Sequence, residues 1–268
     1  MAGKGDSIKT GIPSLAFPYT HSELLEKGLA ALGFETEETT GIGPARVRGI
    51  PSIISLVTLY LKELVLFNAV FDLVGAETNS EQGLCDLVVR HILDSLAPWK
   101  EIATALTEPG AAEKTGSARL HVADAGSGAG FPGIPLAIIF PEIQFTLIER
   151  MSRRCSFLEN CAAILGLKNV LVVNSEVEKA ERHSFDLVVF RAFRPLDRTM
   201  IRTLLALTRS GGMLAAYKAK REKIIEEMAA VEAEVSGWKM IRLFVPFLEH
   251  EERHLVLTAS ETSPNRPS

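Results

Sequence analysis

The chain has 268 residues, of which 47% are hydrophobic and 23% are charged, with a formal net charge of −4. This composition suits a folded protein with a sizeable core, and it excludes a disordered polyelectrolyte or a histone-like basic protein. Three cysteines without a C-x-x-C pair exclude a disulfide framework. The apolar stretch from Ile53 to Leu66 contains Lys62 and Glu63, so it is too short and too charged for a membrane span. Because the first 15 residues also lack the apolar region of a secretory signal, we expect a cytoplasmic protein.

The N-terminal part of the chain has the pattern of a helical module. Residues 1–22 are expected to form a flexible tail, and residues 35–51, rich in acidic residues and then in Gly and Pro, to form a loop. Apolar residues at helical spacing predict a short helix from Ser22 to Gly33, a long and mostly buried helix from Ser52, and a third helix from Glu81 to Leu96. The composition of residues 108–117 is that of a linker. We therefore expect a helical module over residues 23–117.

After this linker, short apolar runs alternate with helical patterns. This alternation predicts βαβ units and a mainly parallel sheet covered on both faces, forming a second domain over residues 118–260 with a tail over 261–268. Only a short connection joins the last two runs, so they are expected to pair antiparallel. The strands are expected at Leu120–Asp124, Ile143–Glu149, Val170–Val173, Phe185–Phe190, Gly212–Tyr217, Lys239–Val245 and Arg253–Ala259.

Charge is distributed unevenly along the chain. Residues 148–223 hold 15 Lys and Arg against 8 Asp and Glu, whereas residues 1–120 hold 10 against 15. A basic stretch inside an acidic chain suggests a local anionic partner such as nucleic acid. Solvated helix faces would give the same composition, so charge alone does not decide between the two.

The segment Asp124-Ala-Gly-Ser-Gly-Ala-Gly-Phe131 follows a predicted strand and precedes a predicted helix. In that setting, glycines let the backbone approach a ligand closely. Glu149 ends the next strand, 23 residues after Gly126, where its carboxylate would accept hydrogen bonds from both hydroxyls of an adenosine ribose. These features predict an adenosine-containing cofactor.

Two details of this loop favour one cofactor. A dinucleotide fingerprint starting at Gly126 requires glycine at position 131, where the chain has Phe131. The spacing here is G-x-G-x-G, preceded by Asp124, and an acidic residue suits a sulfonium cofactor with a free amino group better than a pyrophosphate. Together with the antiparallel strand pair, this points to S-adenosylmethionine.

Longer strings carry a family resemblance. DAGSGAGFPGIPLAIIFPE, FTLIER, FDLVVFRAF and the upstream RHILDSL from Arg90 to Leu96 are similar to the RsmG (GidB) family of bacterial 16S rRNA guanine-N7 methyltransferases. The resemblance runs from about Leu56 to Ala259. It implies a class I S-adenosylmethionine-dependent methyltransferase: a Rossmann-like, mainly parallel seven-stranded sheet with a terminal antiparallel strand, plus the N-terminal helical module.

The resemblance also implies roles for individual residues. Arg191 and Lys218 are expected to be catalytic. The chain departs from the family pattern at Ala219, usually glycine, and at Asp72-Leu73-Val74, usually Asn-Leu-Thr, which affects the expected RNA-facing surface. The expected cofactor-binding residues are Asp124, Gly126, Ser127, Gly128, Gly130, Phe131, Glu149, Val177, Glu178 and Arg191.

The implied partner is 16S rRNA or a small-subunit ribosomal particle, bound by a monomeric enzyme without metal. Basic residues near the predicted strand ends would contact RNA phosphates. They are Arg153, Arg154, Arg194, Arg198, Lys218, Lys220 and Arg221.

Guanine N7 carries a lone pair and no proton, so its methylation needs no general base, and placing the reactants in line does most of the work. The sequence agrees, because it has no evident catalytic triad or metal cluster. Arg191 is expected to orient the base or a neighbouring phosphate.

Three alternatives stay open at this point. One is a methyltransferase for a small molecule or a protein, which the basic segment disfavours. Another is a non-catalytic RNA-binding or assembly factor, which the intact glycine loop and Glu149 disfavour. The third is a nicotinamide-dependent dehydrogenase, which Phe131 disfavours most strongly.

Overall fold

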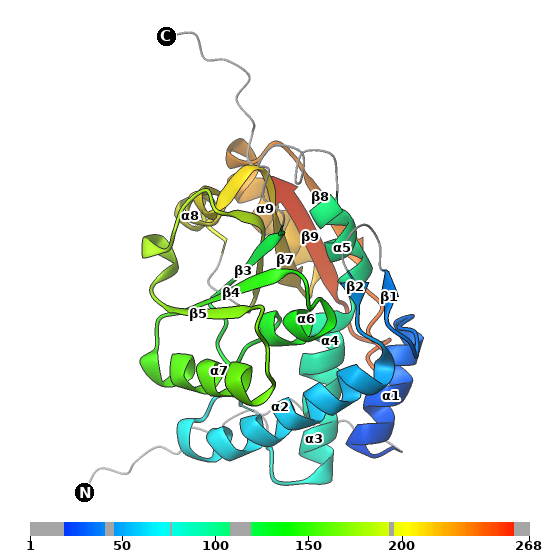
Figure 1. The fold of residues 1–268 in the computed structure, drawn as a ribbon. Coiled ribbons are helices and arrows are strands. Elements are labelled where there is room, and N and C mark those ends of the chain that lie inside the picture. Colours follow the sequence, from blue (N-terminus) through cyan, green and yellow to red (C-terminus); the bar gives the residue numbers. More distant parts are fainter. Residues whose placement is uncertain (1–18, 41–45, 76, 108–118, 193–195, 260–268) are drawn as a thin grey trace, which may run out of the picture.

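A computed structural model describes residues 19–40, 46–75, 77–107, 119–192 and 196–259. Its main feature is a seven-stranded sheet in the order β5-β4-β3-β6-β7-β9-β8 (Figure 1). The first five of these strands are parallel, and β9 runs antiparallel to both β7 and β8. The predicted fold class and the terminal antiparallel pair are therefore confirmed. The strands are β3 (His121–Ala125), β4 (Gln144–Glu149), β5 (Val170–Asn174), β6 (Phe185–Arg191), β7 (Thr208–Lys218), β8 (Trp238–Arg242) and β9 (His254–Ala259).

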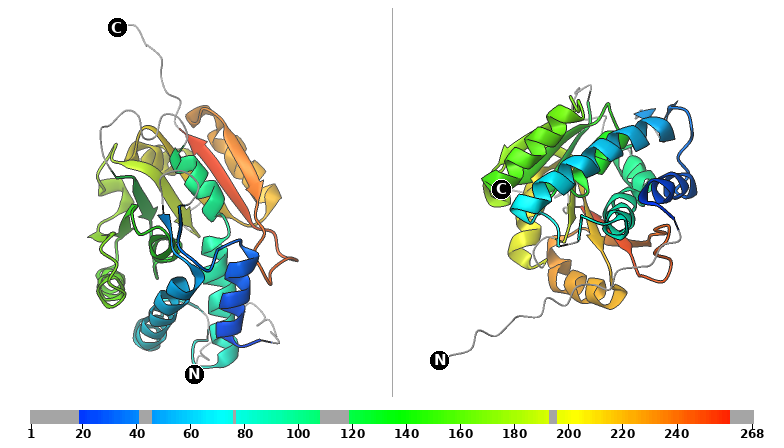
Figure 2. Two further views of the ribbon diagram at one scale, coloured as in Figure 1. Left: turned by 45° about the vertical axis from the view of Figure 1, so that its right-hand side comes forward. Right: turned by 90° about the horizontal axis from the view of Figure 1, so that it is seen from below.

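Helices cover both faces of the sheet, as the continuous apolar strands require. Along β6, Leu187 and Val189 face one hydrophobic cluster while Val188 and Phe190 face the other, the period of two of a strand buried on both sides. The larger cluster lies under α6 (Gly133–Ile139), α7 (Ser152–Ile164) and the N-terminal helices, and the smaller lies under α8 (Arg198–Leu207) and α9 (Arg221–Val231) (Figure 2). Short 3₁₀ turns, η2 (Val177–Lys179) and η3 (Glu232–Glu234), complete this part.

The N-terminal helices are α1 (His21–Ala31), α2 (Ile50–Phe71), α3 (Glu81–Leu87), α4 (Asp94–Leu96) and α5 (Trp99–Thr107). Between α3 and α4 runs a π-helical segment, η1 (Val88–Leu93), inside what the sequence predicts as one helix. Helix α5 was not predicted, although its buried residues recur at helical spacing. Only a loop was expected over residues 35–51, where the described part forms two two-residue strands, β1 (Thr39–Thr40) and β2 (Arg46–Val47), paired antiparallel.

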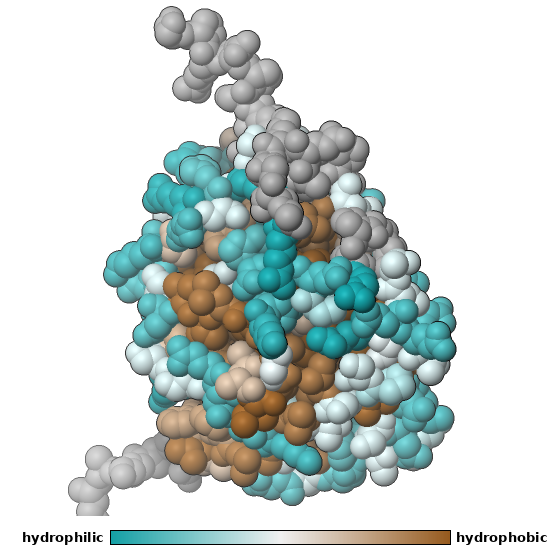
Figure 3. Space-filling view, in the orientation of Figure 1, coloured by the Kyte–Doolittle hydropathy of each residue, from teal (hydrophilic) through white to brown (hydrophobic). Residues whose placement is uncertain are grey.

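The long helix α2 is less buried than predicted. Five of its 22 residues are buried, and Leu66 and Val70 are 64% and 75% exposed. Figure 3 shows apolar surface at the end of this helix. Among the described residues, α2 is the one helix long and apolar enough to cross a membrane, with 28% of the tested window buried. One such helix is weak evidence for a membrane span, because helices that contribute to a protein core pass the same test.

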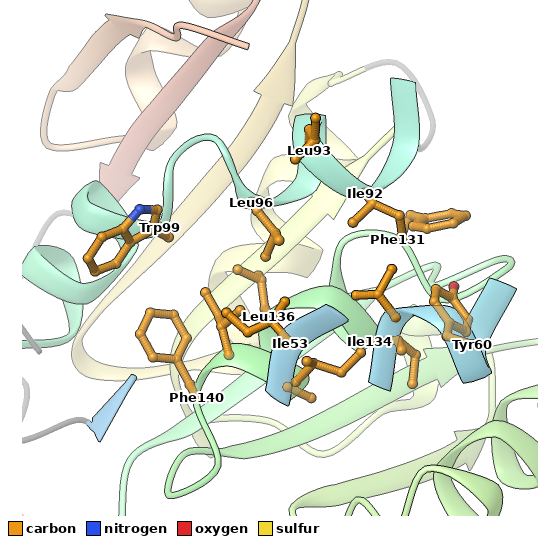
Figure 4. Close-up of a cluster of buried hydrophobic side chains, with 14 of the residues drawn as sticks. Ile53, Tyr60, Ile92, Leu93, Leu96, Trp99, Phe131, Ile134, Leu136 and Phe140 are labelled. Atoms are coloured by element: carbon orange, nitrogen blue, oxygen red, sulfur yellow. The ribbon is translucent and has the colours of Figure 1, made fainter. Parts of the chain in front are cut away.

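The N-terminal helices and the sheet share one core. The larger cluster joins Leu24 of α1 and Ile53 of α2 to Ile134 of α6 and Phe145 of β4, all of which are fully buried. Figure 4 shows side chains of α2 and α6 facing one another, with Tyr60 beside Phe131. The helices therefore form one wall of the same folded unit, and the domain boundary near residue 118 stays a prediction.

Candidate active site

The glycine loop follows β3 and is shaped by left-handed backbone. Gly126, Gly128 and Gly130 have φ values of 74°, 60° and 95°, a region that side chains other than glycine rarely adopt. The amides of Gly126 and Ser127 donate to the carbonyl of Ile148 at the end of β4, at 2.9 and 3.1 Å. These hydrogen bonds hold the loop across the carboxyl ends of β3 and β4, where ligands bind in open α/β sheets.

The glycines of the loop differ in what surrounds them. A Cβ on Gly128 would meet only the carbonyl of Gly126, at 3.9 Å, so this side of the loop is open to a ligand. A Cβ on Gly130 would lie 2.7 Å from Ile134 and 2.9 Å from the hydroxyl of Tyr60. Gly130 is thus required for close packing against α2 and α6.

Asp124 lies beneath the loop. Its side chain is fully buried, and its Oδ2 accepts a hydrogen bond from the amide of Gly133 at 2.9 Å. Burial raises the pKa of Asp124 to about 7, against the lowering effect of that hydrogen bond. The carboxylate stabilises the turn into α6, and Asp124 lines neither of the two cavities described below.

A cavity of about 270 Å³, which we call the Glu149 cavity, opens beside the loop. Glu149 is 4% exposed, and its two carboxylate oxygens accept from the amides of Gly128, at 3.0 Å, and Met151, at 2.8 Å. A carboxylate oxygen can accept two hydrogen bonds, so each of these oxygens can still accept one from a ligand. The lining residues are Gly126, Ile148, Glu149, Arg150, Met151, Arg154, Ser175, Glu176, Val177 and Ala192.

Of the ten expected cofactor residues, only Gly126, Glu149 and Val177 line this cavity. Ser127 is buried, and its hydroxyl donates to the carbonyl of Asp124 at 3.0 Å. Phe131 is 6% exposed and lies between Tyr60 and His91, with ring centroids 5.6 and 4.9 Å away. Glu178 lies in the short turn η2, next to the lining residue Val177.

Arg191 ends β6 and makes its contacts with the RHILDSL segment. Its Nη1 donates to Asp94 Oδ2 at 2.9 Å and to the carbonyl of Arg90 at 3.2 Å, and its Nη2 lies 3.0 Å from Nδ1 of His91. The guanidinium also lies over the ring of Phe131, 5.1 Å from the centroid. His91 and Asp94 therefore fix the N-terminal helices against the sheet, with Arg191 as their shared partner.

A second arginine, Arg253, also contacts the RHILDSL segment. Arg253, which precedes β9, places its Nε 3.3 Å from Asp94 Oδ1 and its Nη2 2.8 Å from Glu251. Glu251 in turn lies 2.8 Å from Arg90. The Asp94 carboxylate is thus shared by Arg191, at the end of β6, and Arg253, just before the start of β9.

Around these groups lies a second cavity, the Lys218 cavity, of about 530 Å³. Lys218 ends β7, and its Nζ lies 2.5 Å from Oε2 of Glu227 on α9. Ala192, which follows β6, lines both this cavity and the Glu149 cavity, so the two are neighbours. The lining residues are His91, Asp94, Phe190, Arg191, Ala192, Tyr217, Lys218, Ala219, Glu227, Leu243, Arg253 and His254.

Several residues of the Lys218 cavity were not predicted as site residues, namely Tyr217, Glu227, Arg253 and His254. The spacing of the apolar residues of α9 offered one signal. Ile224, Met228 and Val231 are its buried residues, so position 227 lies at the edge of the buried face.

The expected RNA-binding arginines and lysines lie mostly at the surface. Arg153, Arg198, Lys220 and Arg221 are exposed, whereas Arg154 is half-buried with its Nη1 3.9 Å from Glu149. Arg198 donates to the carbonyl of Ala230 at 3.3 Å, which directs it toward α9. Arg194 lies outside the described residues.

The described residues show neither a metal site nor a reactive cysteine. Among the described residues, no group of three or more His, Cys, Asp or Glu side chains is placed to hold a metal ion. Cys85, Cys155 and Cys161 are unpaired thiols and buried, and burial raises the pKa of Cys161 well above its usual value. Cys155 donates to the carbonyl of Glu149 at 3.1 Å, so it supports the strand end.

A parallel sheet ending in an antiparallel strand, with a glycine loop after β3 and a carboxylate at the end of β4, defines a class I S-adenosylmethionine-dependent methyltransferase. A family model described as rRNA small subunit methyltransferase G matches residues 53–256. The chain belongs to this family.

Relatives named ribosomal RNA small subunit methyltransferase G match most of the chain. The protein from Treponema denticola is 39% identical over 253 residues, covering 87% of this chain and 92% of the relative. The one from Treponema pallidum is 38% identical, covering 78% and 86% respectively. That from Polynucleobacter asymbioticus is 32% identical, covering 90% and 99%.

The burial of His91 leads to a prediction about stability. Desolvation, together with the charges of Arg191 and Arg90, lowers the pKa of His91 to about 3. The ring is therefore neutral in the folded protein, and its Nδ1 accepts from Arg191. The unfolded chain binds a proton at about pH 6.5 and the folded one does not, so stability is lost as the pH falls below that value.

We expect His91→Gln to remove this dependence. Between about pH 7 and pH 4.5 the free energy of unfolding of the native protein should fall relative to that of the variant by a few kcal/mol, since one pKa unit corresponds to about 1.4 kcal/mol. Urea unfolding at several pH values measures this difference. Parallel stability curves for the two proteins would contradict it.

Proposed function

We propose that the protein transfers the methyl group of S-adenosylmethionine to N7 of a guanosine in 16S rRNA. Membership of the family supports the reaction and the substrate. The observation that carries the proposal is that Ala192 lines two neighbouring cavities, one beside the glycine loop and the other lined by cationic side chains. A methyl donor in one cavity and an acceptor base in the other would be held close together, and such positioning accelerates transfer.

The Glu149 cavity suits the cofactor. Glu149 would accept hydrogen bonds from the ribose hydroxyls, and the open side of Gly128 would admit the amino acid portion. Val177 offers an apolar surface to the adenine. Once bound, the cofactor supplies an electrophilic methyl group.

Asp124, Ser127, Gly130 and Phe131 would act on the cofactor indirectly. They hold the loop in place, Asp124 and Ser127 through hydrogen bonds within it and Gly130 and Phe131 through packing against α2.

Arg191 and Lys218 would act on the guanosine. Because N7 carries a lone pair and no proton, the chain needs no general base, and its task is to hold the base in line with the methyl group. Asp94 and His91 hold the guanidinium of Arg191 at the wall of the Lys218 cavity. We propose that it orients the base or its phosphate from there.

The exposed Arg153, Lys220 and Arg221 are proposed to contact RNA phosphates, with Arg154 and Arg198 beside them. Such contacts make binding fall steeply with salt concentration. We propose that the enzyme works as a monomer in the cytoplasm and docks on rRNA within a small-subunit particle.

The direct test is transfer of labelled methyl from S-adenosylmethionine to small-subunit particles that lack the native modification, followed by mapping of the modified nucleotide. Label on the N7 atom of one guanosine is the expected result. Tight cofactor binding without label on any ribosomal RNA would overturn the proposed substrate.

Glu149→Gln tests the cofactor site. The amide keeps the size of the carboxylate but loses the charge that strengthens hydrogen bonds to the ribose, so the affinity for S-adenosylmethionine should fall about tenfold or more. Calorimetric titration measures this. Glu159→Gln, on the exposed side of α7, is the matched control and should bind normally. Equal affinities for the two variants would remove Glu149 from the site.

Arg191→Ala tests the guanosine side. Methyl transfer should fall at least about 100-fold, as for loss of a group that positions the reactants, while cofactor affinity changes little. Arg202→Ala is the control, because Arg202 forms an exposed ion pair with Glu234 at 2.6 Å, away from both cavities. Near-normal turnover by Arg191→Ala would exclude the proposed role.

A further inference from the structure

The ion pair between Lys218 and Glu227 is the most accessible pair of charges in the Lys218 cavity. The side chains are 20% and 31% exposed, compared with 14% and 9% for Arg191 and Asp94. Arg191 is held by Asp94, His91 and a carbonyl, and Arg253 by Asp94 and Glu251. The chain therefore offers a base entering the cavity a donor and an acceptor in contact with one another.

This pair complements one edge of guanine. That edge carries O6, an acceptor, next to N1–H and the exocyclic amino group, both donors. An ammonium group only donates and a carboxylate only accepts, so Lys218 suits O6 and Glu227 suits the two donors. Adenine presents an amino group and an unprotonated N1 at the same positions. The amino group would then face Lys218, donor against donor, and N1 would face Glu227, acceptor against acceptor.

The orientation that follows agrees with the reaction. In guanine, O6 lies between N1 on one side and N7 on the other. With N1–H on Glu227 and O6 on Lys218, N7 is on the far side of O6 from Glu227. Lys218 ends β7, and β7 pairs with β6, whose Arg191 lies opposite Tyr217. Methyl transfer then requires N7 to face the β6 end, where Ala192 lines both cavities.

The position of Glu227 is fixed by the packing of α9. It lies between the buried Ile224 and Met228 on α9. The helix start is tied down by Glu252, which accepts from the amide of Arg221 at 3.1 Å. Glu226, the next residue on the same helix, is exposed and does not line the cavity.

We propose that Glu227 is a specificity-determining residue, which accepts hydrogen bonds from N1–H and the 2-amino group of a guanine taken out of the RNA stack, while Lys218 donates to O6. Enzymes that modify bases read an extruded base in this way, through its Watson–Crick edge. The inference rests on the proposed function and adds the recognition of the base to it.

The test compares guanosine with inosine, which keeps O6, N1–H and N7 but lacks the 2-amino group. Small-subunit particles are reconstituted with 16S rRNA that carries either nucleoside at the mapped methylation site. For the native enzyme, kcat/KM should be about tenfold lower or more on inosine, the effect of one hydrogen bond to a charged acceptor. Glu227→Gln should methylate guanosine more slowly and should lose most of this preference.

A purely structural role for Glu227 predicts something different. Its loss would slow transfer to both particles equally and leave the ratio of guanosine to inosine unchanged. Glu226→Gln is the matched control and should keep both the native rate and the native ratio. Calorimetric titration with S-adenosylmethionine should give the same affinity for all three proteins, which keeps effects on the cofactor site separate.

The outcomes separate the two proposals. Label on guanosine with an unchanged ratio in Glu227→Gln, or with no preference in the native enzyme, overturns this inference and leaves the proposed function intact. Normal cofactor binding without label on either particle overturns the proposed function, and this inference with it.

Discussion

The ion pair between Arg191 and Asp94 is the interaction on which the rest of the site depends. One partner ends the central strand β6 and the other belongs to the N-terminal helices, and both are largely buried. The pair fixes the helices over the carboxyl ends of the strands. Without Arg191, Asp94 would keep its contact with Arg253 but would lose its hydrogen-bonded partner on β6. Because Arg253 also contacts Asp94, the same carboxylate sets where β9 begins relative to β6.

The fold was largely predictable because its signals are local. Buried parallel strands are short apolar runs, and the glycines after β3 mark the turn into α6. The short connection before β9 was enough to predict antiparallel pairing. The two-residue strands β1 and β2 were not predictable, since they are too short to have a period. The π-helical segment η1 depends on packing between distant elements, which no local pattern encodes.

The site was predictable where residues end strands, because those ends gather at one edge of the sheet. Gly126, Glu149 and Lys218 line cavities for this reason. Asp124 and Phe131 stand in the same motif, yet they brace the loop from below and from the side of α2. The motif does not reveal which of its residues face the ligand, because this depends on α2, more than 50 positions earlier in the chain. Glu227 was missed because only the packing of α9 brings it to Lys218. The roles assigned to individual residues remain predictions.

The contact between α2 and the glycine loop has a consequence for motion. Tyr60 donates from α2 to the carbonyl of Ala129, and its hydroxyl leaves no space for a side chain at position 130. The loop opens in this direction only if α2 moves away from the sheet, which exposes the fully buried Ile53, Val57 and Leu64 to water. Three glycines would make an isolated loop mobile. Here the population of its open conformations is set by the free energy of detaching a helix, a form of local unfolding.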